Sequence, residues 1–365
     1  MSRDRVSARF PDFPWDTIAG AKTRAQAHPD GIVDLSIGTP VDPTPSIAQD
    51  ALIAAANSPG YPTVHGPASL RTAASAYLDR RFGVQVDPAS VLPTIGSKEL
   101  IANLPQQLGL GRDDVVVFPR LAYPTYAVGA EYTGSRTLAA DDPSEYGDTP
   151  PALVYVNSPA NPTGEIRSAD ALREIVAYGR EHGALVVSDE CYLEFGWDAE
   201  PVSVLHPDVC GGSHEGLLAL HSTSKRSNLA GYRDALVVGD ASVVAELLEV
   251  RKHLGFMLPT PVAAAMEAVL ADDAHVDLQR ELYRVRRADL RAALEGAGFT
   301  IEHSEGSLYL WATRHEDCRA TLDWLADRGI LVAPGDFYGP AGQQFVRVAI
   351  MATDERVAAA VSRLG

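Results

Sequence analysis

The chain contains few cysteines, few lysines and no long apolar segment. Its three cysteines, at positions 191, 210 and 318, form no close pair, so we expect a reducing compartment, with neither a disulfide framework nor a metal site. No run reaches the about 18 apolar residues that a membrane span needs, and the first 16 residues lack the apolar core of a secretory signal. Only four of the 31 basic residues are lysines, and arginine cannot replace lysine in covalent amine chemistry.

Acidic residues outnumber basic ones by 48 to 31, which gives a formal net charge of −17. A field of this sign repels polyanions, so we expect neither nucleic acid nor a membrane surface as a partner. The length of 365 residues is enough for two domains, and the composition is ordinary for a globular protein. These features together predict a cytoplasmic protein that acts on small molecules.

Short apolar runs alternate with helical patterns through the middle of the chain. Nearly continuous apolar strands separated by helices are typical of a parallel sheet that is buried on both faces. We therefore predict a large α/β domain over residues 46–272, with a mixed, mostly parallel sheet. The expected strands are 91–95, 153–157, 185–189, 217–221 and 235–239, and the clearest helices are 169–182, capped by Ser168 and Gly183, and 242–253.

The last part of the chain follows a different pattern. A long amphipathic helix is expected over 275–296, followed by four strands (299–303, 307–313, 330–333 and 345–350) and two helices (317–328 and 354–363). This order predicts a smaller α+β domain made of residues 273–365 together with residues 1–45. The first 45 residues are expected either to pack against this domain or to form a lid.

The polar residues that follow the predicted strands indicate a cofactor site. Parallel strands bring their carboxyl ends to one edge, where ligands bind. The residues delivered there are an amide, a carboxylate, a phenol, hydroxyls, a lysine and an arginine: Asn161, Asp189, Tyr192, Ser222, Ser224, Lys225, Arg233 and the run Gly96-Ser97-Lys98.

The residue types at this edge indicate which cofactor is bound. Backbone N–H groups at the helix start after Gly96 suit a phosphate, yet neither a Walker loop nor a G-x-G-x-x-G fingerprint is present. A lysine just after two serines suggests an aldehyde held as a Schiff base. A strand-end aspartate suggests a protonated ring nitrogen. Together these features predict pyridoxal phosphate, an electron sink that depends on such an acid.

Four motifs, Asn161-Pro162-x-Gly164, Asp189-x-x-Tyr192, Ser222-x-Ser224-Lys225 and Arg233, resemble the signature of fold-type I pyridoxal-phosphate aminotransferases of the aspartate aminotransferase class. The resemblance runs from Leu35 to Arg347. It implies a fold-type I transferase with a large, mostly parallel sheet domain and a smaller α+β domain. Segments such as GYPTVHGPASLR and LAYPTYAVG are similar to actinobacterial N-succinyldiaminopimelate aminotransferases.

The resemblance also implies a role for each residue. Lys225 would bind the cofactor aldehyde and move the substrate proton, and Asp189 would face the ring nitrogen. Tyr192 and Asn161 would hydrogen-bond the phenolic oxygen of the cofactor, and Tyr123 would stack on its ring face. The phosphate would be held by Gly96, Ser97, the Lys98 backbone, Ser222, Ser224 and Arg233. Arg347, beside Gly38 and Asn161, would bind the substrate carboxylate. Tyr61 resembles a tyrosine that reaches the phosphate of a neighbouring subunit, which implies a homodimer with composite sites.

The expected reaction is amino transfer from glutamate to a 2-oxo acid, namely N-succinyl-2-amino-6-oxopimelate of lysine and diaminopimelate biosynthesis. The alternatives are another amino-acid aminotransferase of class I or II, or a pyridoxal-phosphate-dependent carbon–sulfur β-lyase, because one fold supports all of these reactions. A regulator built on an aminotransferase-like body is disfavoured, since the chain has no spare length or basic patch for a DNA-binding module.

Three further features have simpler interpretations. His221 is expected to be a packed strand residue, and the Arg286, Arg287 and Arg291 run to be the solvated face of a helix. Asp234 follows Arg233 where many relatives have a small residue. It is expected either to weaken the phosphate contact or to point into solvent.

Overall fold

The computed structural model describes residue 10 and residues 12–365. The predicted N-terminal lid over residues 1–45 therefore lies partly outside the described residues. The first 16 residues, in which no secretory signal was expected, lie mostly outside them as well. No helix within the described part of the chain is both long and apolar enough to cross a membrane.

Seven strands form the large sheet, in the order β2-β8-β7-β6-β5-β3-β4. β8 runs antiparallel to both of its neighbours, whereas β7, β6, β5, β3 and β4 are parallel, so the predicted mixed, mostly parallel sheet is confirmed. The strand bounds are β2 (Val91–Thr94), β3 (Val115–Phe118), β4 (Arg136–Ala139), β5 (Leu153–Asn157), β6 (Leu185–Asp189), β7 (Leu217–Ser222) and β8 (Ala235–Gly239).

Alternate residues of these strands face two separate hydrophobic cores. Val154 and Val156 of β5 belong to the core that includes α3 and α6, whereas Leu153 and Tyr155 belong to the core that includes α4, α5 and α9. Burial on both faces explains why the strands read as continuous apolar runs. The helices of this part are α2 (Ser46–Ala54), α3 (Ala68–Phe82), α4 (Ser97–Gln107), α5 (Thr125–Thr133), α6 (Ala169–His182), α7 (Pro207–Cys210), α8 (Thr223–Arg226), α9 (Ala241–Leu254) and α10 (Thr260–Leu270).

Helix α6 shows how local sequence sets its own ends. The Ser168 side chain accepts a hydrogen bond from the Ala171 N–H, and Gly183 adopts a left-handed conformation with φ of 71°. Each device satisfies a backbone group that the helix leaves free at one end. Both predicted boundaries of this helix are confirmed.

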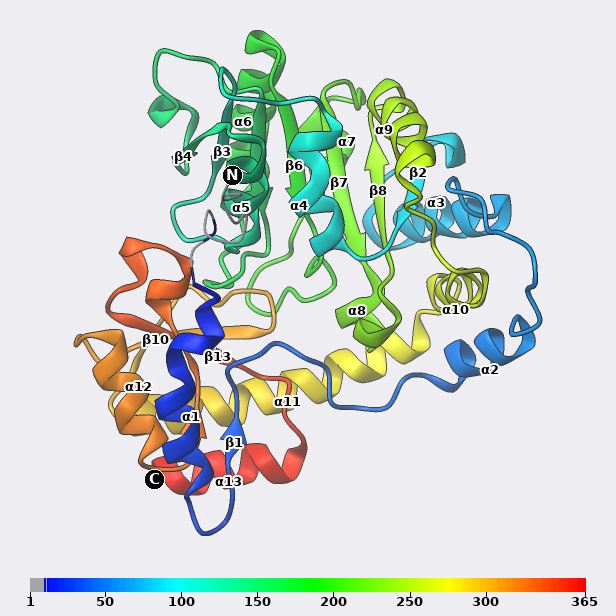
Figure 1. Cartoon of the computed structure of the whole chain (residues 1–365). Coiled ribbons are helices and arrows are strands. Elements are labelled where there is room, and N and C mark those ends of the chain that lie inside the picture. The colour runs from blue at the N-terminus through cyan, green and yellow to red at the C-terminus, as the bar shows by residue number, and fades with distance from the viewer. Residues whose placement is uncertain (1–9, 11) are drawn as a thin grey trace, which may run out of the picture.

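A second group of strands lies beside the C-terminal helices (Figure 1). An antiparallel sheet has the order β12-β13-β10-β9, and a separate parallel pair joins β1 to β11. The single strand predicted over 330–333 is wrong, because the structure has two short strands there, separated at Val332. The first, β11, belongs to the parallel pair, and the second, β12, belongs to the antiparallel sheet. The bounds are β1 (Val33–Asp34), β9 (Thr300–Glu302), β10 (Tyr309–Thr313), β11 (Ile330–Leu331), β12 (Ala333–Pro334), β13 (Phe345–Ala349), α1 (Ala19–Gln26), α11 (Ala274–Gly296), α12 (Cys318–Ala326) and α13 (Asp354–Leu364).

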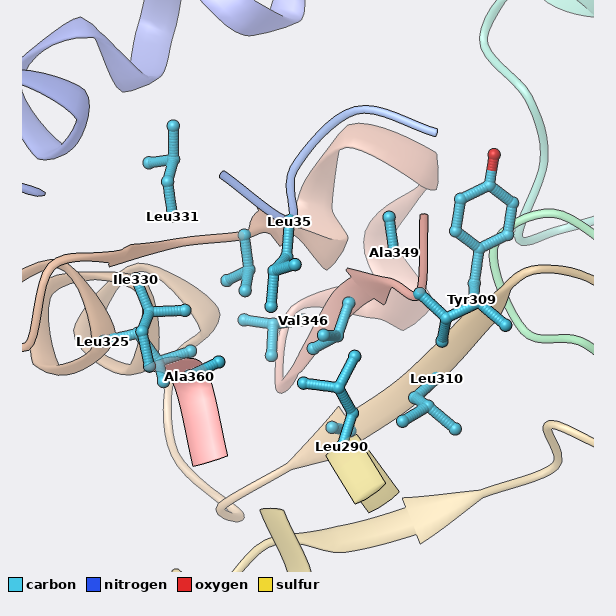
Figure 2. Close-up of a cluster of buried hydrophobic side chains, with 14 of the residues drawn as sticks. Leu35, Leu290, Tyr309, Leu310, Leu325, Ile330, Leu331, Val346, Ala349 and Ala360 are labelled. Carbon is cyan, nitrogen blue, oxygen red and sulfur yellow. The ribbon is translucent and has the colours of Figure 1, made fainter. Parts of the chain in front are cut away.

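Figure 2 shows the core of this second group, in which Leu35 from the N-terminal part packs among side chains of the C-terminal part, such as Leu290 and Val346. Residues near Leu35 thus pack against the smaller unit, which was one of the two expectations for the N-terminal segment. The division into domains at 45/46 and 272/273 stays a prediction. Short 3-10 helices complete the secondary structure at Pro14–Ile18, Pro88–Ser90, Pro143–Glu145, Ala230–Tyr232, Gly335–Tyr338 and Pro340–Gly342.

Candidate active site

A cavity of about 500 Å³ lies at the carboxyl ends of β5, β6 and β7, a volume within the usual range for small-molecule sites. Residues from the N-terminal segment and from β10 and β13 also line it. The structure brings together twelve of the residues singled out in the sequence: Gly38, Ser97, Lys98, Tyr123, Asn161, Asp189, Tyr192, Ser222, Ser224, Lys225, Arg233 and Arg347. Neither Gly96 nor Tyr61 lines the cavity, although Gly96 lies against the guanidinium of Arg233.

Lys225 lies in α8, which starts directly after β7. Ser222 ends the strand and caps the helix, because its hydroxyl accepts a hydrogen bond from the Ser224 N–H at 3.1 Å. The Lys225 amine donates a hydrogen bond to the carbonyl oxygen of Gly38, in the N-terminal segment. Removal from water lowers the pKa of Lys225 to about 8, and the positive charges of Arg347 and Arg233 act in the same direction.

Asp189 ends β6 with its carboxylate buried. The Tyr126 hydroxyl donates a hydrogen bond to its Oδ2 atom at 2.8 Å, and the Cys191 N–H donates to Oδ1 at 3.2 Å. Burial raises the pKa of Asp189, while these two contacts oppose the shift. Sequence analysis missed Tyr126, because a tyrosine on an apolar helix turn carries no chemical signature.

Asn157 was also missed, although it holds the loop that carries Asn161. Its Nδ2 atom donates to the Asp189 carbonyl oxygen at 2.8 Å, and its Oδ1 atom accepts from the Asn161 N–H at 2.7 Å. Asn157 and Asp189 are direct partners across the β5–β6 pair. One buried amide therefore fixes two predicted site residues relative to each other.

Gly96 precedes α4 with φ of 100°, a conformation that favours glycine. A Cβ atom at this position would lie 2.4 Å from Nη2 of Arg233, so only glycine allows the guanidinium to come this close. The Ser222 and Ser224 hydroxyls lie 2.9 Å apart in the same part of the cavity. Hydroxyls, a guanidinium and the first N–H groups of a helix converge here, and this donor set fits a phosphate.

The expectation that Asp234 points into solvent is wrong, because the residue is fully buried. The other expectation, a weakened phosphate contact of Arg233, stays a prediction. The Asp234 carboxylate accepts a hydrogen bond from the Thr223 hydroxyl, and its backbone carbonyl accepts one from Ser222 at 3.2 Å. Burial raises the pKa of Asp234 to about 6. Asp234 thus links α8 to the turn that carries Arg233.

Arg347 lies in β13 and is 3% exposed. Its Nη1 atom donates to Asn161 Oδ1 at 2.8 Å and its Nη2 atom donates to the Ser36 carbonyl at 2.7 Å, while its buried Nε atom has no partner. The guanidinium carbon lies 4.0 Å from the centre of the Tyr309 ring. Arg347 lines the cavity, and a buried guanidinium with N–H donors left over is suited to bind a carboxylate.

Tyr309 is a further lining residue that sequence analysis did not single out. Its hydroxyl lies 2.9 Å from the hydroxyl of Tyr192, and burial raises the pKa of Tyr192. A Cβ atom at Gly38 would lie 2.1 Å from the Tyr309 hydroxyl, so this close approach requires a glycine. Trp15, Ile37 and Thr39 also line the cavity without having been predicted.

Three other expectations have different outcomes. The Tyr61 side chain is 96% exposed, away from the cavity of its own chain. His221 is a packed strand residue, as expected, because it stacks on Phe82 and burial lowers its pKa to about 3. The expectation that the arginine run forms a solvated helix face is wrong for Arg286 and Arg287. Both are buried, at 4% and 9% exposed, and both form ion pairs with acidic residues.

The chemistry of the donor set fits pyridoxal phosphate. The donors of Gly96, Ser222, Ser224 and Arg233 would suit its phosphate, and the buried Asp189 carboxylate would suit its ring nitrogen. The Lys225 amine, with its lowered pKa, would suit its aldehyde.

The aminotransferase class I and II family model matches residues 30–364. The chain is 62% identical over its full length to "Probable aminotransferase Rv1178" of Mycobacterium tuberculosis, covering 87% of that protein. It is 58% identical to 4-dedimethylamino-4-oxo-anhydrotetracycline transaminase OxyQ of Streptomyces rimosus, over 97% of this chain and 99% of OxyQ. A solved structure described as a probable N-succinyldiaminopimelate aminotransferase from Thermus thermophilus aligns with a TM-score of 0.86 and 28% identity, over 96% of this chain and 99% of that one.

The family model covers nearly the whole chain, and the observed sheet agrees with the fold that these relatives share. The chain therefore belongs to the class I and II aminotransferases, pyridoxal-phosphate-dependent enzymes of fold type I.

Proposed function

We propose that Lys225, Asp189 and Arg347 form the catalytic centre of an aminotransferase that takes its amino group from glutamate. The observation that carries this proposal is the placement of all three in one cavity, with the Arg347 Nε atom buried and unpartnered. When bound, the cofactor supplies an electron sink for bond breaking at the substrate α-carbon.

In this proposal the residues divide the work by charge. Arg347, oriented by Asn161 and by the Ser36 carbonyl, binds the substrate α-carboxylate. Lys225, with a pKa of about 8, is partly neutral near neutral pH and takes the α-proton and returns it. Asp189 would hold the proton on the ring nitrogen, and Tyr192 and Asn161 would hydrogen-bond the phenolic oxygen. Tyr123 would pack on the ring, and the phosphate would be held by Gly96, Ser97, Lys98, Ser222, Ser224 and Arg233.

A single-turnover experiment tests this centre. Wild-type protein loaded with pyridoxal phosphate is mixed with glutamate, and the cofactor absorbance is followed. The Lys225→Ala variant should show no conversion and no lysine-linked absorbance band, while retaining its circular dichroism spectrum. Lys252→Ala serves as a matched control, since Lys252 is paired with Glu249 at the surface. Normal turnover in Lys225→Ala would refute the assignment.

For the amino acceptor we propose N-succinyl-2-amino-6-oxopimelate. The similarity of several segments to N-succinyldiaminopimelate aminotransferases supports this substrate, and so does the aligned Thermus structure of that description. The test converts the protein to its pyridoxamine form and measures the return of the aldehyde spectrum with this acceptor and with simple 2-oxo acids. A rate constant that is no higher than with those simple acids argues against the proposal.

A second candidate acceptor is a ring ketone, because OxyQ, at 58% identity, is named for a 4-oxo-anhydrotetracycline. The same pyridoxamine assay, run with a polycyclic ketone, separates the two candidates. A carbon–sulfur β-lyase remains the other reaction to compare. Release of pyruvate from cystathionine, faster than transamination with glutamate, would favour that alternative.

We also propose that the protein works as a homodimer in which Tyr61 reaches the phosphate of the neighbouring subunit. The support is its exposed side chain, which has no role in its own cavity. Mixing Tyr61→Phe and Lys225→Ala chains tests this directly, because composite sites leave each hybrid dimer with one doubly altered site and one intact site. Activity above that of either parent variant is expected. A cytoplasmic location stays a prediction.

A further inference from the structure

A segment of the N-terminal part passes directly over Lys225. We call residues 36–44 the strap. It follows β1, leads to α2 and lines the cavity with Ile37, Gly38 and Thr39. Near its start the Ser36 carbonyl accepts from Arg347 at 2.7 Å, and two residues later Gly38 accepts from Lys225.

The far end of the strap is held by α11. Both Nη atoms of Arg286 donate to the Asp42 carboxylate, at 2.6 and 2.7 Å, and Gln279 Nε2 donates to the same carboxylate at 2.8 Å. Arg286 is almost fully buried, so this pair is poorly screened by solvent. These contacts lower the pKa of Asp42 despite its partial burial.

The turn after Lys225 reaches the same helix. Asn228, with φ of 54°, donates from Nδ2 to the Oε1 atom of Gln279 at 2.8 Å. Its Oδ1 atom accepts from the Tyr283 hydroxyl at 3.3 Å, and its carbonyl accepts from Thr44 Oγ1 at 3.3 Å. Asn228 and Gln279 are both at least nine-tenths buried.

Gln279 therefore lies between the strap and the lysine turn, with each end of its amide bonded to one of them. Its orientation is determined by its partners, because the Asp42 carboxylate only accepts and the Asn228 Nδ2 group only donates. We propose that Gln279 is a positioning residue that, through Asp42 and Asn228, holds the strap against Lys225. This inference rests on the proposed role of Lys225.

Loss of this bridge has two consequences that differ from simple destabilisation. A strap that moves away from Lys225 admits water, which relieves the desolvation that lowers the amine pKa and replaces Gly38 as an acceptor, so the pKa rises towards its ordinary value. The Ser36 carbonyl moves as well and no longer orients Arg347. The KM for glutamate should therefore rise more than kcat falls.

The test uses Gln279→Glu, which keeps the shape but places a carboxylate beside Asp42. A second variant, Gln279→Met, keeps the length of the side chain but removes both hydrogen bonds of the amide without adding charge. Gln26→Glu is the control for added charge, because Gln26 is exposed at the end of α1.

The main readout needs no cofactor. Apoprotein is labelled with acetic anhydride across a pH series, and mass spectrometry follows the four lysines separately, with Lys252 as the surface reference. In wild type the Lys225 midpoint should lie near pH 8. Gln279→Glu and Gln279→Met should both raise it by about one pH unit, with a KM for glutamate raised about tenfold, whereas Gln26→Glu should change neither.

An unchanged Lys225 midpoint in folded Gln279→Glu overturns the proposal, even where the melting temperature falls, because a purely structural role predicts that pattern. An unchanged Lys225 midpoint in folded Gln279→Met overturns it as well. Failure of the proposed function gives a different result, namely transamination by Lys225→Ala, while the labelling midpoints still report the geometry.

Discussion

Replacing Arg347 with lysine measures directly how the proposed carboxylate site works. Arginine has five N–H donors, and Asn161 and the Ser36 carbonyl use one each, so three remain for a substrate. A lysine ammonium has three donors, and the same two acceptors leave it one. The variant keeps the positive charge but loses two-point binding of a carboxylate.

Losing one hydrogen bond to a charged group costs about 1.5–3 kcal/mol, which corresponds to a roughly 10- to 150-fold decrease in kcat/KM for glutamate. The assay is the single-turnover reaction with glutamate over a range of concentrations. Butylamine, which has no carboxylate, serves as the comparison substrate and should react at nearly the wild-type rate. Equal losses with both amines, or no loss with glutamate, would refute the role of Arg347.

Three further outcomes are expected. Tyr126→Phe removes a donor to Asp189, so the pKa of that buried acid should rise further, and the acid limb of the kcat profile should move to higher pH. Gly96→Ala places a methyl group against Arg233, so pyridoxal phosphate should bind at least tenfold more weakly in equilibrium dialysis. Because the pKa of Asp234 is raised to about 6 in the folded apoprotein, the free energy of unfolding should decrease as pH rises from about 4 to 6. Asp234→Asn does not titrate, so chemical denaturation should show its free energy of unfolding increasing by up to about 3 kcal/mol relative to wild type across that range.

Local chemistry in the sequence was enough to predict much of the fold. The strands 153–157, 185–189 and 235–239 match β5, β6 and β8, and Ser168 and Gly183 bound α6 as expected, because caps and apolar runs act over a few residues. The gathering of most candidate site residues around one cavity was also predictable, since the carboxyl ends of β5, β6 and β7 meet at one edge.

Contacts between distant segments were decided only by the tertiary structure. Arg286 looked like part of a solvated helix face, yet Asp42, 244 positions away along the chain, pairs with it in a buried site. Asp234 is buried and bonded to Thr223, whereas one expectation from the sequence was that it points into solvent. Tyr126 and Gln279 belong to no motif, because each is bonded to side chains that lie far away in the sequence, Tyr126 to Asp189 and Gln279 to Asp42 and Asn228. Short-range patterns determine which elements form, while packing determines which polar groups lose water and must find each other as partners.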